Sequence, residues 1–374
     1  MRPLSKTRVL IFLTHADNGG TQEISRLLKK GLGARGYDVS ELFFVRGSDF
    51  IQESPDTIIC ALPPGRGLLH YGRMARLAVT EIRRHKPDVL ICLQWGGNLL
   101  GGFAAWLAGI RVVIANQFTT PIVPGPVRRI DRLQGSLGLF SRIVVNSETI
   151  EKEHADYPQS YRTRLVRIDH GFRDKSSKLS RAEARAIFGL PPGANLLGSV
   201  GRLAAEKHFD AAIRLLPGNS GWHLAIAGHG PEADSLRALA ASLGCADQLH
   251  LIGEVHPDKV GDFLAALDVF VFPSLGETFG LAVVEAAQAG IPVVANDLEV
   301  LREVLAVDGK PCALFVDVDN EAVFAQAVSR VLQDESLCGQ LTDLGGRLKD
   351  RYPLDKMFDD YDRLIKDALS EVKA

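Results

Sequence analysis

The sequence predicts an α/β protein built from two doubly wound domains. The chain has 374 residues, which is long for a single hydrophobic core. Short apolar runs, each followed by a Gly or polar turn and a helical pattern, alternate along the first half, and the alternation starts again after residue 195. Strands that alternate with helices indicate parallel sheets covered on both faces, so we expect one such sheet in each half.

The apolar runs give the expected strands. In the first half they are VLIFL (9–13), VSELFFV (39–45), VLICL (89–93), VVIAN (112–116) and IVVNS (143–147). In the second half they are LLGSVG (196–201), HLAIAG (223–228), HLIG (250–253), VFVFP (269–273), PVVAN (292–296) and ALFV (313–316). Helical patterns between them cover residues 22–32, 71–84, 98–107, 209–216, 232–243, 281–289 and 321–332.

The domain boundary is expected near Asp169–Phe172, because a polar segment follows and Ser180 is a plausible N-cap for a new helix. This divides the chain into a first domain over residues 1–172 and a second over 173–352. Tyr352–Pro353 breaks the chain, and 353–374 carries a final helix expected to pack back on the first domain.

Composition is that of an ordinary soluble enzyme, with 46% hydrophobic and 24% charged residues and a net charge of −2. The charge is uneven: residues 1–172 hold 23 Lys and Arg against 15 Asp and Glu, a balance of +8, and the rest of the chain carries −10. The basic half suggests an anionic partner, although solvated helix faces that happen to differ would give the same count.

Membrane-spanning, secreted and zinc-binding classes are not favoured. No stretch approaches the ~20 apolar residues of a membrane span, and the run at 9–13 is too short for a signal peptide. The five cysteines form no C-x-x-C pair and have no histidine at metal spacing, so we expect buried, reduced thiols in a cytosolic protein.

The segment PSLGETFGLAVVEA (273–286) is the most informative motif. It follows an apolar run and precedes a helical pattern, so it predicts a strand, a tight loop and a helix whose N-terminus faces the strand's carboxyl end. Such a helix start attracts anions, and Gly280 permits close backbone approach by a ligand. Glu277 and Glu285, eight residues apart, each offer a carboxylate to a hydroxyl. An anion with two hydroxyl-binding carboxylates suggests a sugar nucleotide.

Three further motifs follow expected strands. GRLAAEKHFD (201–210) places Arg202 and Lys207 five residues apart around a turn, which suits a diphosphate. DNGGTQ (17–22) has Gly19 and Gly20, where the backbone can approach a ligand, although an ordinary turn explains them as well. AGHGPE (227–232) fits either a tight turn or a ligand contact, and we expect its His229 to be exposed.

Two residues invite other interpretations. Asp317–Val318–Asp319 has the form of a D-x-D metal motif, but it precedes an amphipathic helix, so Asp319 is more simply its cap. Trp95 follows the third strand and is expected to pack on the domain face.

GRLAAEKH, AGHGPE, HLIGEV and the E-x7-E of GETFGLAVVE, in this order and spacing, resemble the family 4 retaining glycosyltransferases of the GT-B fold. PVVANDLEVLREV extends the resemblance, which is nearly continuous from 196 to 335. In the first half it rests on the GG pair and IVVNSE (143–148). The resemblance implies two Rossmann-like domains facing a central cleft, with the acceptor bound by the first and a nucleotide-diphosphate sugar by the second.

The resemblance also implies roles for individual residues. Arg202 and Lys207 would hold the donor diphosphate and, with Glu277 on the hydroxyls of the transferred sugar, form the catalytic set. Glu285 would hold the ribose. Backbone groups of Phe279, Gly280 and Leu281 would contact sugar and phosphate. Val255 would lie near the nucleobase. Gly19 and Gly20 would bind the donor from the first domain, with Gly20 approaching the diphosphate. The family needs no divalent metal, since cations and a helix N-terminus stabilise the leaving diphosphate.

Two departures from the family pattern stand out. Family members often carry a histidine facing the donor sugar after the strand that matches VVIAN. This chain has Gln117 there, which can contact the sugar through a hydrogen bond but cannot act as an acid or base. The family's Gly-Gly after PVVA is replaced by Glu299 and Val300, so sugar contacts by that loop are in doubt.

We therefore expect a cytoplasmic retaining glycosyltransferase, peripheral on the inner face of the membrane, in bacterial lipopolysaccharide or surface-glycan assembly. Its partners would be the nucleotide-sugar donor, a glycan or glycolipid acceptor and an anionic membrane surface met by the basic first domain, with no nucleic acid, cofactor or metal. Arg83–Arg84 and the arginines of GPVRRIDRLQ suit that surface. A sugar-nucleotide epimerase, a phosphorylase or a non-catalytic nucleotide-sugar-binding protein of the same fold remain alternatives. The absence of a Gly-rich dinucleotide fingerprint disfavours a dehydrogenase.

Overall fold

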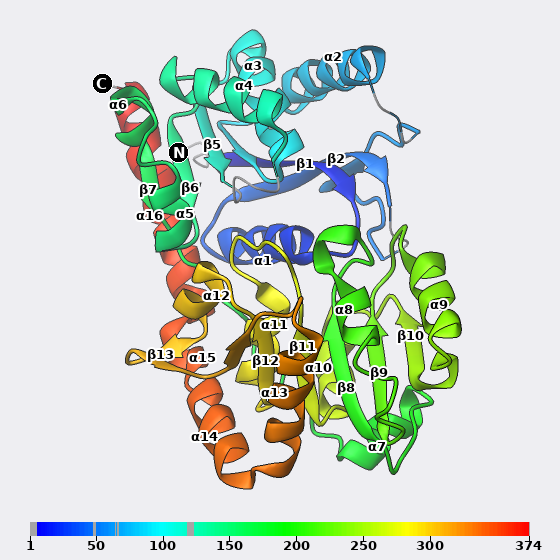
Figure 1. Cartoon of the computed structure of the whole chain (residues 1–374). Helices are drawn as coiled ribbons and strands as arrows, with labels where there is room; N and C mark the ends of the chain where they lie inside the picture. The colour runs from blue at the N-terminus through cyan, green and yellow to red at the C-terminus, as the bar shows by residue number, and fades with distance from the viewer. Residues whose placement is uncertain (1–5, 48–49, 64, 66, 118–122, 374) are drawn as a thin grey trace. The chain divides into compact units, whose positions relative to one another are not determined.

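The computed structural model describes residues 6–47, 50–63, 65, 67–117 and 123–373. The chain forms two compact units (Figure 1). Unit 1 comprises residues 1–171 and 354–374, and unit 2 comprises residues 172–353.

Unit 1 is built on a seven-stranded parallel sheet in the order β3-β2-β1-β4-β5-β6-β7. The strands are β1 (Arg8–Ala16), β2 (Asp38–Arg46), β3 (Thr57–Ile59), β4 (Val89–Cys92), β5 (Val112–Asn116), β6 (Arg142–Val145) and β7 (Leu165–Arg167). The helices are α1 (Gly20–Ala34), α2 (Leu68–His85), α3 (Trp95–Ala108), α4 (Gly125–Ser136), α5 (Glu148–Glu153), α6 (Gln159–Arg162) and α16 (Leu354–Lys373). Figure 1 shows α2, α3 and α4 on one face of this sheet and α1 on the other.

Unit 2 is built on a six-stranded parallel sheet in the order β10-β9-β8-β11-β12-β15. These strands are β8 (Asn195–Val200), β9 (Trp222–Ala227), β10 (Leu249–Gly253), β11 (Val269–Phe272), β12 (Val293–Asn296) and β15 (Leu314–Val316). A hairpin pairs β13 (Ala306–Val307) with β14 (Lys310–Pro311). The helices are α7 (Arg181–Ile187), α8 (Phe209–Ile213), α9 (Ala233–Ser242), α10 (Val260–Ala265), α11 (Leu281–Gln288), α12 (Glu299–Val304), α13 (Glu321–Gln333), α14 (Glu335–Gly346) and α15 (Leu348–Arg351), with short 3₁₀ helices η1 (Ala205–Lys207), η2 (Ala246–Gln248) and η3 (Pro257–Lys259).

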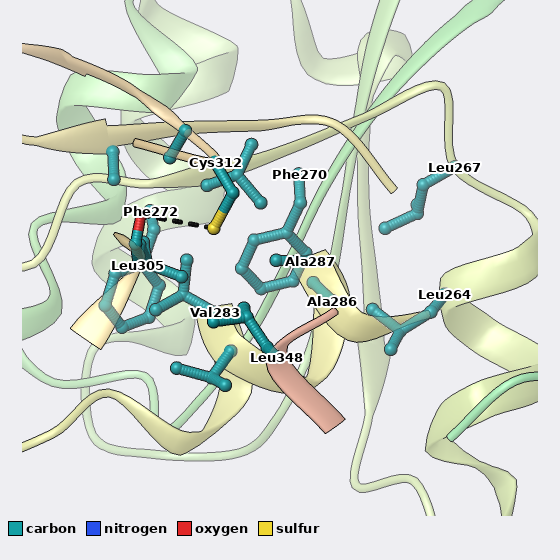
Figure 2. Packing of buried hydrophobic residues seen from close by; sticks show 14 of the residues in the cluster. Leu264, Leu267, Phe270, Phe272, Val283, Ala286, Ala287, Leu305, Cys312 and Leu348 are labelled. Atoms are coloured by element: carbon teal, nitrogen blue, oxygen red, sulfur yellow. Dashed lines mark hydrogen bonds between the residues drawn. The ribbon is translucent and has the colours of Figure 1, made fainter. Parts of the chain in front are cut away.

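The core of unit 2 lies on both faces of its sheet, because successive residues of a strand point to opposite sides. Phe270 and Phe272 of β11 pack into one apolar cluster, and Val269 and Val271 pack into the other. Figure 2 shows the first cluster, in which the Cys312 thiol donates to the Leu305 carbonyl at 3.1 Å. A strand buried on both faces has to be apolar throughout, which is why VFVF reads as a continuous run.

The predicted fold class is confirmed, including the final helix. α16 packs on α1, where Arg35 pairs with Asp359 at 2.6 Å. On its buried side, the Tyr361 hydroxyl donates to Asn116 Oδ1 at the end of β5, at 2.6 Å. The chain thus returns to unit 1 after completing unit 2.

Of two predicted helix caps, one is confirmed and one is wrong. Ser180 caps α7, in a capping box with Glu183. The cap of α13 is Asn320, whose side chain accepts from Val323 N, and not Asp319. Asp319 instead lies 2.9 Å from His208 Nε2. Adjacent Asp and Asn residues are both good caps, so sequence alone could not choose between them.

The prediction of buried, reduced cysteines holds for three of the five. All five cysteines are free thiols, but only Cys92, Cys245 and Cys312 are buried, while Cys60 and Cys338 are half-buried. In the part of the chain that the structure describes, no helix is long and apolar enough to cross a bilayer.

Candidate active site

The strand order of unit 2 points to one edge of its sheet. From β8 the chain moves to β9 on one side, and from β11 it moves to β12 on the other. The connections after β8 and β11 therefore run in opposite directions, and the place between them is a topological switch point. Open α/β sheets bind their ligands at such points. These two loops contain the two strongest sequence motifs, GRLAAEKH and PSLGETFG.

An ion pair joins the two loops. Lys207 Nζ forms a salt bridge and hydrogen bond with Glu277 Oε1. The side chains are 22% and 11% exposed, so the pair is largely withdrawn from water but still reachable. Lys207 Nζ also lies 5.7 Å from the centroid of the Phe272 ring, within range of a cation–π contact.

Backbone contacts fix the geometry of this pair. Leu275 N donates to the Glu206 carbonyl at 2.9 Å. The Ser274 hydroxyl lies 3.2 Å from the same carbonyl and 3.2 Å from that of Gly276. Asn296 Nδ2, from β12, donates to the Ser274 carbonyl at 3.0 Å. Ser274 could not be predicted from the sequence, because its role depends on the two loops being neighbours.

The turn before α11 requires a glycine. Gly280 has φ of 79°, in the left-handed region, and precedes the first residue of the helix, Leu281. A Cβ at Gly280 would lie 3.0 Å from side-chain atoms of both Leu301 and Val283. The first turn of α11 contains no acidic residue, so its positive dipole end is not neutralised within the helix. The helix starts where the sequence predicted, and binding of an anion there stays a prediction.

Phe279 can offer only its backbone to a ligand. Its ring is 1% exposed and packs against the rings of Phe172 and Tyr352, with centroid distances of 5.4 and 5.2 Å. The aromatic contacts anchor the loop that presents Gly280. The implied contact through the Phe279 backbone fits this burial.

Glu285 lies one turn into α11 and is 12% exposed. Its Oε1 is 3.7 Å from Lys175 Nζ, which also donates to the Pro257 carbonyl at 2.7 Å. Lys175 was not singled out from the sequence, because it lies in the polar segment that follows the expected domain boundary. The lysine places a positive charge beside the carboxylate predicted to hold a ribose.

The remaining predicted residues of unit 2 lie on neighbouring loops. Arg202 follows β8 and is exposed, and among the described residues none pairs with its side chain. Val255 follows β10, is half-buried, and lines an open groove with Ile252 and Glu254. Arg202 is thus free to meet an anion, and Val255 offers an apolar wall.

The glycines of AGHGPE have a structural explanation. A Cβ at Gly228 would lie 1.8 Å from the Gly201 carbonyl oxygen, and one at Gly230 would lie 2.2 Å from that of Leu203. Leu203 N also donates to the His229 carbonyl at 3.0 Å. These glycines let the loop after β9 support the loop that carries Arg202 and Lys207. His229 is exposed, as predicted.

In unit 1, Gly19 and Gly20 lie at the corresponding switch point, between β1 and β4. Gly19 precedes α1 with φ of −138°, and Gly20 is the first residue of the helix. Both are exposed. Neither backbone conformation requires glycine. The absence of side chains instead leaves the backbone open to a ligand at the start of a 15-residue helix.

Gln117 points into unit 1. It is 8% exposed, and its Nε2 lies 3.0 and 3.2 Å from the two carboxylate oxygens of Asp131. The Tyr161 hydroxyl donates to Asp131 at 2.8 Å. Burial raises the pKa of Asp131, and these hydrogen bonds oppose the rise. A narrow pocket adjoins the group, with Asn98 and Trp95 among its lining residues.

Gln117 therefore holds a buried carboxylate in place, and its contact with a sugar stays a prediction. The sequence offered one overlooked signal for Asp131, since this acid is the only one in a helix rich in arginine. Residues 118–122 of the same loop lie outside the described residues.

Comparison with known proteins shows which family of proteins the chain resembles. Residues 18–173 match the profile described as Glycosyltransferase Family 4, and residues 180–345 match that described as Glycosyl transferases group 1. The lipopolysaccharide core biosynthesis glycosyltransferase LpsE of Rhizobium meliloti (strain 1021) is 31% identical over 338 residues, covering 90% of this chain and 88% of LpsE. The match to the lipopolysaccharide core biosynthesis mannosyltransferase LpsB of the same strain, 31% identical over 178 residues, covers 45% of this chain and spans only half of LpsB.

The fold agrees with a solved structure. Sucrose-phosphate synthase from Thermosynechococcus elongatus has a TM-score of 0.82 at 17% identity, covering 98% of this chain and 100% of that structure. Together with the two family profiles and the LpsE match, this shows that the chain is a glycosyltransferase that belongs to family 4 and has the GT-B fold.

Proposed function

We propose that this enzyme moves a sugar, with retention, from a nucleotide-diphosphate sugar to an acceptor hydroxyl in lipopolysaccharide or surface-glycan assembly. The observation that carries the donor part is the Lys207–Glu277 pair at the switch point of the second sheet. One side chain of the pair suits a phosphate and the other suits hydroxyls, and a sugar diphosphate presents both groups side by side.

The donor would lie along the carboxyl edge of unit 2. Lys207 and Arg202 would meet the diphosphate, with the start of α11 at Gly280 as a third positive group. Glu277 would accept hydrogen bonds from hydroxyls of the transferred sugar. Glu285 would accept from the ribose, and the wall at Val255 would lie against the nucleobase.

In the reaction, the bond between the anomeric carbon and the β-phosphate oxygen breaks while the acceptor oxygen bonds to that carbon. The acceptor proton passes to the leaving phosphate oxygen on the same face, which preserves the anomeric configuration. The cations stabilise the charge that develops on the diphosphate, and we propose that no divalent metal is required.

The comparisons guide the choice of substrates. Solved structures of similar fold include Anabaena Alr3699/HepE in complex with UDP and glucose, at a TM-score of 0.81 and 16% identity over 96% of this chain and 99% of that structure. UDP-sugars are therefore the first donors to test. The name of LpsE points to a lipopolysaccharide-core acceptor, and the basic first half suits an acceptor at an anionic membrane surface.

The test is a transfer assay with UDP-, GDP- and ADP-sugars and a soluble core oligosaccharide, with and without EDTA. We expect one donor to give a glycosylated product of retained configuration at an equal rate in EDTA. Conversion of the donor in the absence of acceptor would indicate an epimerase instead. Binding without any turnover would indicate a non-catalytic nucleotide-sugar-binding protein.

A further inference from the structure

Unit 1 exposes an unusual concentration of apolar side chains. Of the eleven large hydrophobic residues that are exposed in the described part of the chain, six lie between residues 103 and 137. They are Phe103 (39% exposed), Trp106 (65%), Leu107 (52%), Ile130 (36%), Leu133 (51%) and Leu137 (66%). Single exposed hydrophobics are normal, but a local group of six indicates an interaction surface.

The first half of this surface comes from α3. The helix has the sequence WGGNLLGGFAAWLA, which contains no charged residue. Its inner face is buried against the sheet, and Phe103, Trp106 and Leu107 follow the i, i+3, i+4 spacing of one outward stripe. A helix that is apolar on all sides is ordinarily buried on all sides, whereas α3 leaves one apolar face exposed.

The second half comes from α4 and the residue after it. Ile130, Leu133 and Leu137 share a stripe at i, i+3 and i+7, while Asp131 and Gln134 point inward. Three exposed arginines, Arg128, Arg129 and Arg132, lie on the same helix. The only acid of α4 is the buried Asp131, so no carboxylate of α3 or α4 offsets these charges at the surface.

Hydrogen bonds hold the two helices side by side. Gln134 Nε2 of α4 donates to the carbonyls of Asn98 and Leu99 in α3, at 3.1 and 3.3 Å. Phe103 N donates back to Gln134 Oε1 at 3.1 Å. Figure 1 shows α3 and α4 adjacent on the outer layer of unit 1. The two apolar stripes therefore form parts of one surface.

Further arginine lies at the end of α3. Arg83, in the last turn of α2, donates to the Leu107 carbonyl at 2.7 Å, and Arg84 follows it. The apolar surface is thus bordered by arginine from α2 and α4. Apolar side chains flanked by Arg, with an aromatic residue among them, are the pattern of a helix pair that lies in the interface of an anionic bilayer.

We propose that Phe103, Trp106, Leu107, Ile130, Leu133 and Leu137 form a membrane-insertion face, which enters the headgroup region of an anionic lipid bilayer. The arginines of α2 and α4 bind the lipid phosphates around it. The occupant is a lipid surface because three exposed arginines of α4, with no exposed carboxylate on α3 or α4, adjoin the apolar residues, although Arg84 of α2 pairs with Glu81 at 3.8 Å. This inference refines the membrane part of the proposed function, since it adds apolar insertion at a defined face to general attraction by charge.

Tryptophan fluorescence tests the insertion directly. The chain has three tryptophans, of which Trp222 is 8% exposed and Trp95 is half-buried, so Trp106 is the one that a surface can reach. We expect vesicles of phosphatidylcholine with phosphatidylglycerol to bind the full chain and blue-shift its emission. Bromine-labelled acyl chains should quench the emission, and Trp106→Phe should abolish the quenching while binding persists.

Matched variants separate this face from the rest of the surface. Leu137→Ser should weaken vesicle binding roughly tenfold or more, because a leucine would no longer be buried in lipid. Ile187→Ser, at an equally exposed isoleucine of unit 2 (62%), should leave binding unchanged. Arg129→Ala should weaken binding about fivefold and lessen its salt sensitivity, whereas Arg214→Ala in unit 2 should not.

Three outcomes would overturn the proposal. They are vesicle binding without quenching of Trp106, equal effects of Leu137→Ser and Ile187→Ser, and a dimer that Trp106→Ser dissociates while vesicles fail to bind. Donor binding by Leu137→Ser, measured in solution without lipid, keeps this test separate from the proposed function. If no sugar nucleotide binds, the proposed function fails and the vesicle result still decides the membrane-insertion face.

Discussion

Lys207 and Glu277 stand 70 residues apart in the chain and form a salt bridge at the carboxyl edge of the second sheet. Each residue lies in the loop after a central strand, and β8 and β11 are hydrogen-bonded neighbours. The pair places a cation beside a carboxylate where a ligand of an open α/β sheet binds.

Removing either member of the pair should abolish most transfer. We expect Lys207→Met and Glu277→Gln each to lower kcat by roughly 10²–10³-fold, the range observed when one preorganised electrostatic contact is lost. Because the two side chains act together, the double variant should lose less than the product of the single losses. Steady-state kinetics with an unchanged melting temperature would establish this. Near-normal turnover in both single variants would remove the pair from the site.

Gly280→Ala should destabilise the loop before α11. A side chain in the left-handed region costs ~1–2 kcal/mol, and the contacts with Leu301 and Val283 add to that cost. We expect a lower melting temperature and a raised KM for the donor. Gly193→Ala is the control, since a Cβ there meets nothing within 4 Å and the residue is exposed. Equal effects of the two substitutions would contradict the assignment.

Tyr361→Phe should weaken the packing of α16 on the rest of unit 1. The Tyr361 hydroxyl is the donor to Asn116 Oδ1, and losing it leaves a buried acceptor unpaired, at a cost of ~1–3 kcal/mol. We expect faster hydrogen exchange across α16 and a lower melting temperature. Tyr71→Phe, at a half-buried tyrosine of α2, is the control. Unchanged exchange in α16 would show that the bond does not hold the helix.

Stability should fall on acidification because of His170. Burial lowers the pKa of His170 to about 4 from an ordinary value of 6.5, and Asn146 Nδ2 donates to its Nε2 at 2.9 Å, which requires a neutral ring. Between these pH values His170 is protonated in the unfolded chain but neutral in the folded chain. Stability therefore rises with pH over this window, by up to about 1.4 kcal/mol per pH unit.

His170→Gln should flatten this dependence, and His229→Gln, at an exposed histidine, should not. Denaturation by urea at pH values from 4 to 7 provides the measurement. Parallel curves for the wild type and His170→Gln would rule out the titration of His170 as a cause.

The sequence predicted the parts of the fold that repeat a strong local pattern. Strands such as β4 and β11 are buried on both faces and so read as unbroken apolar runs. β3 and β7 have three residues each, and the hairpin strands β13 and β14 have two, so neither pattern nor length distinguished them. Their existence depends on neighbouring strands that supply hydrogen-bond partners.

The candidate site was predicted residue by residue but not as an arrangement. Lys207 and Glu277 were each placed in a loop after a strand, but their pairing needs β8 beside β11, which sequence separation does not reveal. Likewise, Lys175 beside Glu285 and Asp131 beneath Gln117 depend on tertiary packing. The exposed stripe of α3 was hidden because an apolar helix in a sequence is ordinarily assigned to the core.

Calorimetric titration of the full chain with the donor tests the central claim most directly. The donor is the UDP-, GDP- or ADP-sugar that raises the melting temperature most, and the comparison is between wild type and Lys207→Met. We predict that the wild type binds it and that Lys207→Met, while still folded, binds it at least tenfold more weakly, since a charge-assisted contact with phosphate is lost. Failure of all three donor classes to bind, or equal affinity of the two proteins, would contradict the account.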